Sequence, residues 1–373
     1  MKILHLLKSL HTGGSVTYML KLSAELIARG HEVVVAAGHE EAYPALEAMG
    51  ARFHRVTMSD LRFLSAAGRL AAIIRAEGID VINAHHWTAG AAGYLAGRRT
   101  GVPFLLSVHG TRRAYQRWLV FYWSPRVLVV SARGRDNLVR DMGLAPERVI
   151  ESFIGVDVRR FAPGPPDPAV LAELGLEDGT PVVLHVSRLN ATKGHVARAL
   201  ADAAPRLVES VPAVTVLIAG DGESRSQVEA AAKAANAIIG RRAVRLLGMR
   251  ADVPALMRVA HVVVGTASVA MEALAGGCPV VAAGKYGYMG PVTPETFAAA
   301  DAVCFGDHAA PSRLTPEALA AALSPLLRDA AARRDLGAWG RALMVERFSV
   351  ERMVDQVAAV YEEMRRGGVH WGG

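Results

Sequence analysis

Short runs of branched apolar residues recur along the chain, separated by longer segments in which apolar residues have helical spacing. The first run, at 3–7, is followed by the glycine turn Gly13-Gly14, a helical segment closed by Gly30, and a second run at 32–36. Continuous apolar runs are typical of strands that are buried on both faces, as in parallel sheets. The opening of the chain therefore predicts one β-α-β unit.

The same alternation predicts two series of strands. The first series continues at 80–84, 104–108 and 126–130, and the second covers 182–186, 214–219, 244–247, 261–264, 279–282 and 302–305. Between them, residues 153–168 are rich in glycine and proline, which is typical of a linker. We therefore expect an α/β protein with two Rossmann-like, doubly wound parallel-sheet domains at 1–160 and 161–349. Ligands of such sheets bind beyond the carboxyl ends of the strands.

Length and composition agree with two globular domains. The chain has 373 residues, of which 51% are hydrophobic, enough to bury two cores. No apolar stretch reaches the roughly 20 residues that span a bilayer, because the segment 119–130 is interrupted by Pro125 and Arg126. The first residues lack the cleavage site of a signal peptide. With two cysteines, Cys278 and Cys304, far apart in the sequence, we expect a cytoplasmic protein.

The net charge of +7 is compatible with three kinds of partner: nucleic acid, an anionic membrane surface or a phosphorylated substrate. Arginines are scattered rather than concentrated in one basic run, and the sequence contains no nucleic-acid-binding motif, which argues against DNA or RNA. A phosphorylated substrate remains compatible with the charge. Peripheral contact with the inner membrane face stays open.

A polar loop with two cations follows the predicted strand at 182–186. Arg188 and Lys193 precede Gly194, which opens a helix. A planar guanidinium and a mobile ammonium at the end of a strand can converge on one diphosphate. The alternative is a solvated basic loop. The order of strand, cationic loop and helix favours a functional site.

The Gly13-Gly14 turn lies between the first strand and the first helix. Glycines there let the backbone approach a phosphate at the positive end of a helix. A plain tight turn is equally compatible with the residues, because the full G-x-G-x-x-G dinucleotide fingerprint is missing.

Three histidines follow predicted strands of the first domain. His109 comes directly after the run at 104–108, and His85 and His86 follow the run at 80–84. We expect His109 to face the site. Adjacent residues of an extended segment point to opposite faces, so at most one of His85 and His86 lines the acceptor side. Lone histidines are usually structural, and no third ligand with recognisable spacing accompanies these, so no metal site is predicted.

Ordered motifs extend over most of the chain. In the second half they are Ser-Arg-Leu at 187–189 with Lys193-Gly194, Ala-Gly-Asp-Gly at 219–222, Leu-Gly at 247–248 and the segment 271–282; in the first half they are Gly13-Gly14, His109-Gly110, Val130-Ser131 and Gly155-Val156-Asp157. Together they resemble the glycogen-synthase-like GT-B glycosyltransferases of the family 4 type, also described as glycosyl transferases group 1.

The resemblance implies a fold and an activity. The fold would be GT-B, with the two domains facing each other across a cleft and a C-terminal helix at about 350–373 packed back on the first domain. The activity would be transfer of a sugar from a nucleotide-diphosphate sugar to an acceptor hydroxyl, without a metal or other cofactor and with retention of configuration. The acceptor would be lipid-linked or a saccharide, in cell-surface polysaccharide or glycolipid biosynthesis.

The resemblance also implies roles for individual residues. Arg188 and Lys193 would bind the donor diphosphate, Glu272 the ribose hydroxyls, and His109 the donor sugar near the reaction centre. The donor-binding set would comprise Gly13, Gly14, Gly220, Gly248, Met249, Gly265, Thr266, Ala267, Ser268 and Glu272. A carboxylate suits a vicinal diol on chemical grounds as well. The alternative for Glu272 is a first-turn glutamate that favours the helix dipole.

One motif departs from the family pattern. Many members carry a second glutamate about eight positions before the ribose-binding one, where this chain has Val264 followed by Gly-Thr-Ala-Ser. The sugar-facing part of the donor pocket must therefore be built differently. Two alternatives remain: a nucleotide-sugar epimerase or hydrolase of the same fold, and a non-catalytic subunit that binds the nucleotide sugar. A dehydrogenase is disfavoured, because the glycine fingerprint and the acidic ribose reader are both missing.

Overall fold

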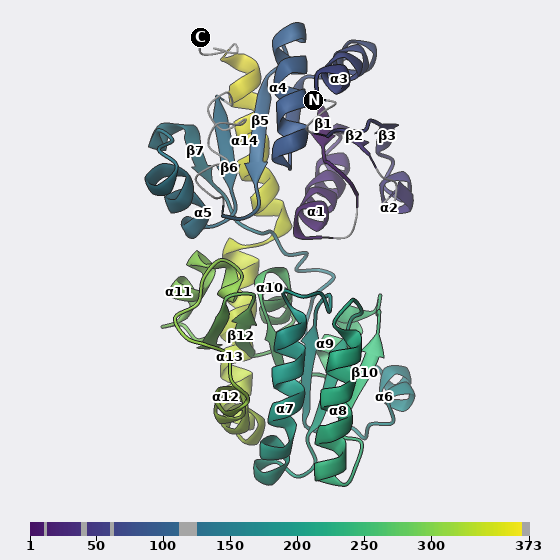
Figure 1. The fold of residues 1–373 in the computed structure, drawn as a ribbon, viewed down its shortest axis with the longest axis vertical. Helices are drawn as coiled ribbons and strands as arrows, with labels where there is room; N and C mark the ends of the chain where they lie inside the picture. Colours follow the sequence, from purple (N-terminus) through teal and green to yellow (C-terminus); the bar gives the residue numbers. More distant parts are fainter. Residues whose placement is uncertain (11–12, 39–42, 60–62, 112–124, 368–373) are drawn as a thin grey trace. The chain divides into compact units, whose positions relative to one another are not determined.

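The chain forms two compact units in a computed structural model, which describes residues 1–10, 13–38, 43–59, 63–111 and 125–367 (Figure 1). The first unit contains Met1–Gly155 together with Val350–Gly373, and the second contains Val156–Ser349. The division falls at Gly155, slightly before the expected end of the first domain at residue 160.

The first unit is built on a seven-stranded parallel sheet in the order β3-β2-β1-β4-β5-β6-β7. The strands are β1 (Lys2–Leu6), β2 (Glu32–Ala37), β3 (Arg52–Arg55), β4 (Val81–Ala84), β5 (Phe104–Val108), β6 (Arg126–Val129) and β7 (Val149–Glu151). All five strands that apolar runs predicted are confirmed. The short strands β3 and β7 were not predicted, because β3 is half-exposed and carries two arginines, and β7 has only three residues.

Helices cover both faces of the first sheet. They are α1 (Gly14–Ala28), α2 (Tyr43–Ala48), α3 (Phe63–Glu77), α4 (Trp87–Thr100), α5 (Ala132–Asp136), the π-helix η3 (Asn137–Asp141), the 3-10 helix η4 (Pro146–Arg148) and α14 (Val350–Arg366). Leu4 and Leu6 pack in one core with α3 and α4. Ile3 packs in the opposite core with α1 and α14. The alternation of strand side chains thus gives each face its own core.

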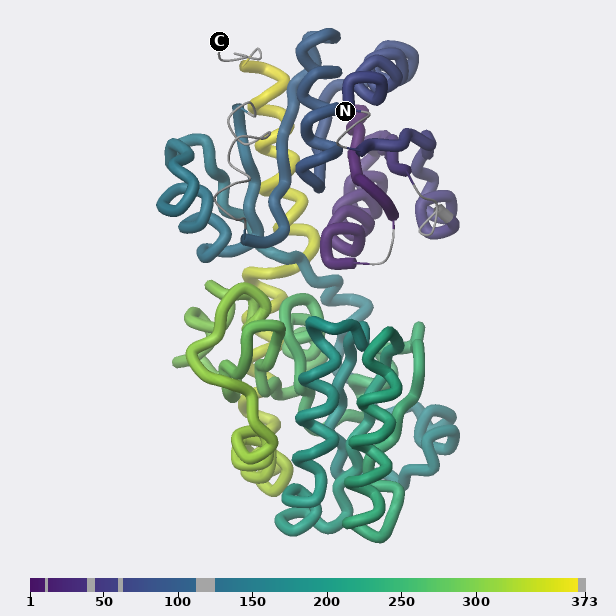
Figure 2. Tube along the Cα trace, viewed as in Figure 1, coloured from purple at the N-terminus to yellow at the C-terminus, as the bar shows by residue number. Residues whose placement is uncertain are grey.

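The last helix, α14, belongs to the first unit although it follows the second in sequence. In the trace it runs beside the strands of the first unit (Figure 2). Its Tyr361 is fully buried, and the Tyr361 hydroxyl accepts a hydrogen bond from Asn83 Nδ2 at 2.5 Å. Asn83 Oδ1 in turn accepts from the Ser107 hydroxyl at 2.9 Å. A buried polar network of this kind fixes how the helix docks, because each group would otherwise lose its hydrogen bonds.

The second unit has a six-stranded sheet in the order β10-β9-β8-β11-β12-β13. The strands are β8 (Val182–Val186), β9 (Thr215–Ala219), β10 (Val244–Gly248), β11 (Val262–Gly265), β12 (Val280–Gly284) and β13 (Gly287–Pro291). All pairs are parallel except β12 with β13, so the unit is not the purely parallel sheet that was expected. An antiparallel edge strand is common on doubly wound sheets.

The helices of the second unit are α6 (Pro168–Leu174), α7 (Gly194–Ser210), α8 (Arg225–Ile239), α9 (Val253–Val259), α10 (Ala267–Ala275), α11 (Phe297–Ala302), α12 (Pro316–Arg328) and α13 (Ala330–Arg347). Figure 1 shows α7 and α8 side by side over the sheet, and with α12 they bury the core around Val183 and Val264. In the same unit, α10 packs against α13.

The predicted strand at 302–305 is wrong. This segment contains the end of α11 and a 3-10 turn, η5 (Cys304–Gly306). Cys304 and Phe305 have positive φ angles of 50° and 55° and are nevertheless almost completely buried. The apolar residues of this segment are apolar because they are buried, although their backbone is not extended. A run of four apolar residues is too short to distinguish a buried turn from a buried strand.

Candidate functional site

The cationic loop joins β8 to α7 in the second unit. Arg188 is exposed, and Lys193 directly precedes the first residue of α7. The loop is held by Asn190, whose Oδ1 accepts hydrogen bonds from the N–H groups of Thr192 and Lys193 at 3.1 and 3.0 Å. A side chain that caps its own turn pre-organises the backbone. Both predicted cations therefore lie in one ordered loop at the carboxyl end of the central strand.

Lys193 has an acidic partner that the sequence did not reveal. Its Nζ lies 3.3 Å from Asp307, which follows η5, and both side chains are 24% exposed. In the sequence, the only indication of Asp307 as a site residue was its position as a polar residue after the apolar run at 302–305. Because that run was predicted as a strand, no contact of Asp307 with the loop after β8 was expected. The candidate diphosphate site thus contains a carboxylate that a phosphate would have to displace or accommodate.

Gly220 has a structural reason to be glycine. Its φ is +139°, and a Cβ atom there would lie 1.8 Å from the backbone oxygen of Ser187. Its N–H donates to the Gly248 carbonyl at 2.7 Å. The loops after β8, β9 and β10 therefore approach one another through this position. The neighbouring Met249 is 68% exposed, and a donor contact by Gly220, Gly248 or Met249 stays a prediction.

The segment after β11 supports the strained turn at 304–306. The buried Thr266 hydroxyl lies 3.0 Å from the Cys304 carbonyl oxygen and 2.9 Å from that of Phe305. Ala267 has a positive φ of 48°. Strained residues of this kind persist where surrounding contacts hold them, and they often gather at functional sites. The Thr266 side chain is thus used within the protein, and a donor contact by Gly265, Ala267 or Ser268 stays a prediction.

Glu272 lies further along α10 than the sequence suggested. The helix begins at Ala267 and has no acidic residue in its first turn, so Glu272 belongs to the second turn and is half-buried. The alternative of a first-turn glutamate that favours the helix dipole is therefore excluded. Its predicted contact with a ribose remains a prediction.

A buried histidine, which the sequence analysis did not single out, lies behind the cationic loop. His185 Nδ1 is 2.8 Å from the Val264 carbonyl oxygen, and its Nε2 is 2.8 Å from the Ser187 hydroxyl. Burial lowers the pKa of His185 to about 4, so the ring is neutral at physiological pH. With Nδ1 donating to the carbonyl, Nε2 accepts from Ser187 and orients that hydroxyl.

In the first unit, the histidines predicted from the sequence lie at the carboxyl ends of β4 and β5. His85 Nδ1 is 3.1 Å from His109 Nε2, so the two rings that sequence reasoning treated separately are in contact. His85 is only 2% exposed, and it meets other rings rather than solvent. His86 Nδ1 instead accepts from the Thr88 N–H and caps α4. A direct acceptor contact by His85 would therefore require this arrangement to change.

The Gly13-Gly14 turn caps α1. Gly13 is extended, with φ of −173°, and its carbonyl accepts the first helical hydrogen bond from Thr17 at 2.8 Å. A Cβ atom at Gly14 would meet nothing within 4 Å. Gly14 is therefore not required by crowding, and a phosphate contact at this helix end stays a prediction beside the alternative of a simple turn.

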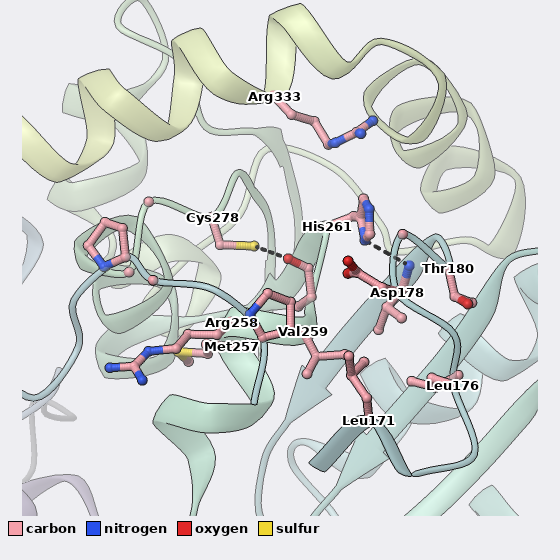
Figure 3. Close-up of a pocket in the computed structure, with 18 of the residues that line it drawn as sticks. Leu171, Leu176, Asp178, Thr180, Met257, Arg258, Val259, His261, Cys278 and Arg333 are labelled. Carbon is pink, nitrogen blue, oxygen red and sulfur yellow. Dashed lines mark hydrogen bonds between the residues drawn. The ribbon is translucent and has the colours of Figure 1, made fainter. Parts of the chain in front are cut away.

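A separate pocket of about 420 Å³ lies at the opposite end of the second sheet (Figure 3). It is lined by residues at the starts of strands, including Val182 and His261, and by none of the predicted site residues. Three of its polar side chains are hydrogen-bonded within the protein: His261 accepts from the Val182 N–H, Cys278 donates to a carbonyl, and Arg333 donates to two carbonyls at the end of α12. We therefore assign this pocket a structural role.

Two further observations bear on cofactors and membranes. Within the described residues, no three histidine, cysteine or acidic side chains are grouped in a way that could hold a metal ion. In the same part of the chain, no helix combines the length and the apolar character needed to cross a bilayer.

Comparison with known proteins identifies relatives for both halves. Residues 12–160 match the sequence profile of Glycosyltransferase Family 4, and residues 168–343 match that of Glycosyl transferases group 1. Alpha-maltose-1-phosphate synthase from Mycolicibacterium smegmatis is 30% identical over 319 residues, which are 78% of this chain and 80% of that protein. A D-inositol 3-phosphate glycosyltransferase from Kineococcus radiotolerans is 28% identical over 377 residues, covering 87% of this chain and 85% of that protein.

Solved structures share the fold over nearly the whole chain. A glycosyltransferase from Rickettsia africae superposes with a TM-score of 0.80 at 18% identity, covering 97% of this chain and 98% of its own. HepE from Anabaena, in complex with UDP, superposes with a TM-score of 0.78 at 20% identity, covering 97% and 100%. Two Rossmann-like units with these relatives confirm the GT-B fold, and the chain belongs to the GT-B glycosyltransferases of the glycosyl transferases group 1 family.

Proposed function

We propose that the protein transfers a sugar from a nucleotide-diphosphate sugar to an acceptor hydroxyl, with retention of configuration and without a metal. The observation that carries this proposal is the loop between β8 and α7, where Arg188 and Lys193 follow the central strand within one ordered turn. The matched relatives support it, because their names describe sugar transfer, and HepE was crystallised with UDP.

The chemistry required of such a site is stabilisation of the leaving diphosphate. Negative charge on the diphosphate grows as the glycosidic bond breaks, and fixed cations placed near it stabilise the transition state. Arg188 can offer a planar pair of donors, and Lys193 a mobile point charge. Glu272 would bind the ribose diol, which holds the nucleotide while the sugar is transferred.

For the acceptor, we propose a lipid-linked or saccharide hydroxyl in cell-surface polysaccharide or glycolipid biosynthesis, reached from the first unit. The reaction would take place in the cytoplasm, with peripheral contact at the inner membrane face. The net charge of +7 supports contact with an anionic surface.

Thermal unfolding with a panel of nucleotides tests the donor. UDP, GDP, ADP and their sugars would each be added at about 100 times the dissociation constant, where a ligand of the folded state adds about 2.7 kcal/mol. We expect one nucleotide family to raise the melting temperature, and its sugar to be transferred to an acceptor. Product analysis separates the alternatives: an epimerase or hydrolase acts without an acceptor, whereas a binding subunit shows the shift without turnover. NMR of the product's anomeric proton tests retention.

A further inference from the structure

Three histidines form a continuous hydrogen-bonded line in the first unit. His5 from β1 is fully buried, and its Nδ1 lies 3.0 Å from His85 Nε2. His85 Nδ1 lies 3.1 Å from His109 Nε2. Tyr18 of α1 packs against the far end, with its ring 4.9 Å from that of His109 in an edge-on arrangement. The line thus runs from the core of the sheet to the candidate sugar-binding histidine.

The inner two rings are neutral. Burial lowers the pKa of His5 to about 3 and holds the pKa of His85 well below its usual range. A neutral imidazole has one N–H donor and one nitrogen that accepts. Each contact in the line therefore needs a donor on one ring and an acceptor on the next.

For uncharged rings this requirement leaves two arrangements. In one, every ring carries its proton on Nδ1, so that His5 donates to His85 and His85 donates to His109. In the other, every ring carries its proton on Nε2 and the donors point the opposite way. The three tautomers are thus coupled, although His5 and His109 do not share a hydrogen bond.

The inner end of the line decides between them. His5 Nε2 is buried and has no hydrogen-bond partner in the described part of the chain. With protons on Nε2, this atom would be an orphaned N–H in the core, and buried orphaned N–H groups are rare and costly. With protons on Nδ1, the N–H groups of His5 and His85 both have an acceptor, and at the inner end only the lone pair of His5 Nε2 is left without a partner.

We propose that His5 and His85 are positioning residues that lock His109 in the tautomer protonated on Nδ1. His109 Nε2 then accepts from His85 and is not available to take up a proton from substrate. His109 consequently acts as a neutral hydrogen-bond donor through Nδ1 and not as a general base. Its part in sugar transfer rests on the proposed function, whereas the tautomers themselves do not.

NMR distinguishes the two tautomers of each histidine directly. Long-range proton-nitrogen correlation spectra of protein labelled with ¹⁵N-histidine distinguish a ring protonated on Nδ1 from one protonated on Nε2. Signals are assigned from the single variants His5→Asn, His85→Gln and His109→Gln. We expect Nδ1 protonation for His5, His85 and His109 in the parent protein. Nε2 protonation of His85 or His109 overturns the proposal, whether or not any sugar is transferred.

Two substitutions in the line test the coupling. His5→Asn keeps an N–H close to the position of Nδ1, so the His109 tautomer should be retained. His85→Phe keeps the volume but removes the donor to the half-buried His109, so His109 should become a mixture of tautomers. Ser107→Ala, a buried polar change on the same face of the sheet, is the control and should leave the His109 tautomer unchanged.

Activity provides a second readout. Loss of one oriented donor is worth about 1 kcal/mol, so His85→Phe should lower kcat by roughly 3- to 10-fold while the KM for donor changes less. His5→Asn should keep kcat within about twofold of the parent. If His85→Phe is folded by circular dichroism and His109 keeps a single Nδ1 tautomer, the line does not control that tautomer and the proposal fails.

Discussion

At the carboxyl end of the first sheet the candidate histidines lie in a hydrogen-bonded line whose inner two rings are buried and neutral, whereas at the carboxyl end of the second sheet the candidate cations are partly exposed. Among the described residues, the non-glycine residues with positive φ angles all lie in the second unit, at Ala267, Cys304 and Phe305. The first unit therefore offers fixed hydrogen bonds to an uncharged group, and the second offers charged side chains, one of which contacts Asp307 next to a strained turn. We expect the sugar to depend on the first unit and the diphosphate on the second.

Removal of the cations should have the largest effect. Arg188→Ala and Lys193→Ala should each lower kcat by about 10² to 10³, roughly 2.7 to 4 kcal/mol, and weaken donor binding less, because the charge they stabilise grows in the transition state. Steady-state kinetics with binding isotherms measure both quantities. Since both residues act on one diphosphate, the double variant should lose less than the product of the single losses.

Arg242→Ala is the matched control for these variants. Arg242 is exposed and precedes β10, at the opposite end of the sheet, so its loss should leave the rate nearly unchanged. Rates within twofold of the parent for both Arg188→Ala and Lys193→Ala would contradict the proposal that these cations stabilise the leaving diphosphate.

The two ends of the comparison also differ in how well the sequence predicts them. Arg188 and Lys193 were predicted because charged residues after a predicted strand stand out in a single stretch of sequence, and Glu272 was predicted through the family resemblance. The histidine line was not found, because His5 and His85 are 80 residues apart and meet only when β1 pairs with β4. The pattern of apolar and polar residues predicts the strands and the loops that follow them, but it does not predict which strands lie side by side.

The fold shows the same limit. Buried parallel strands have continuous apolar runs, and ten of these were predicted correctly, five in each unit. The edge strand β13 was missed, because Gly287 and Gly290 leave it with little apolar character. The segment at 302–305 was wrongly predicted as a strand, because its apolar residues are buried in a turn that Thr266 supports from another part of the chain.

Glu272→Gln should have the next largest effect, and on binding rather than on rate. The amide keeps the size of the side chain but accepts hydrogen bonds from a diol less strongly than the carboxylate does. A hydrogen bond to a charged group is worth about 1.5 to 3 kcal/mol, so the nucleoside diphosphate should bind roughly 10- to 100-fold more weakly. Calorimetric titration measures this, and an unchanged dissociation constant would contradict a ribose contact.

Asp307→Asn should have a smaller effect of the opposite sign. The carboxylate competes with the diphosphate for Lys193, and its removal should tighten nucleotide binding up to about fivefold, as expected for a partly exposed ion pair. The gain should shrink as salt is raised. Glu317→Gln is the control. It removes an exposed carboxylate of α12 that is paired with Arg206 of α7, and it should leave nucleotide binding unchanged. Weaker binding in Asp307→Asn would show instead that Asp307 orients Lys193 for its ligand.

Chelation should have the smallest effect of all. If the fixed cations of the second unit supply the positive charge that the leaving diphosphate needs, a divalent metal has no further charge to contribute, and excess EDTA should leave the rate within about twofold of the untreated protein. The effect of magnesium should therefore differ between the parent protein and Lys193→Ala. The parent should keep its rate without metal. Added magnesium should partly restore the rate of Lys193→Ala, because a mobile cation then replaces the missing one. Loss of nearly all parental activity in EDTA, with recovery on adding magnesium or manganese, would place the decisive charge on a metal and not on the loop between β8 and α7.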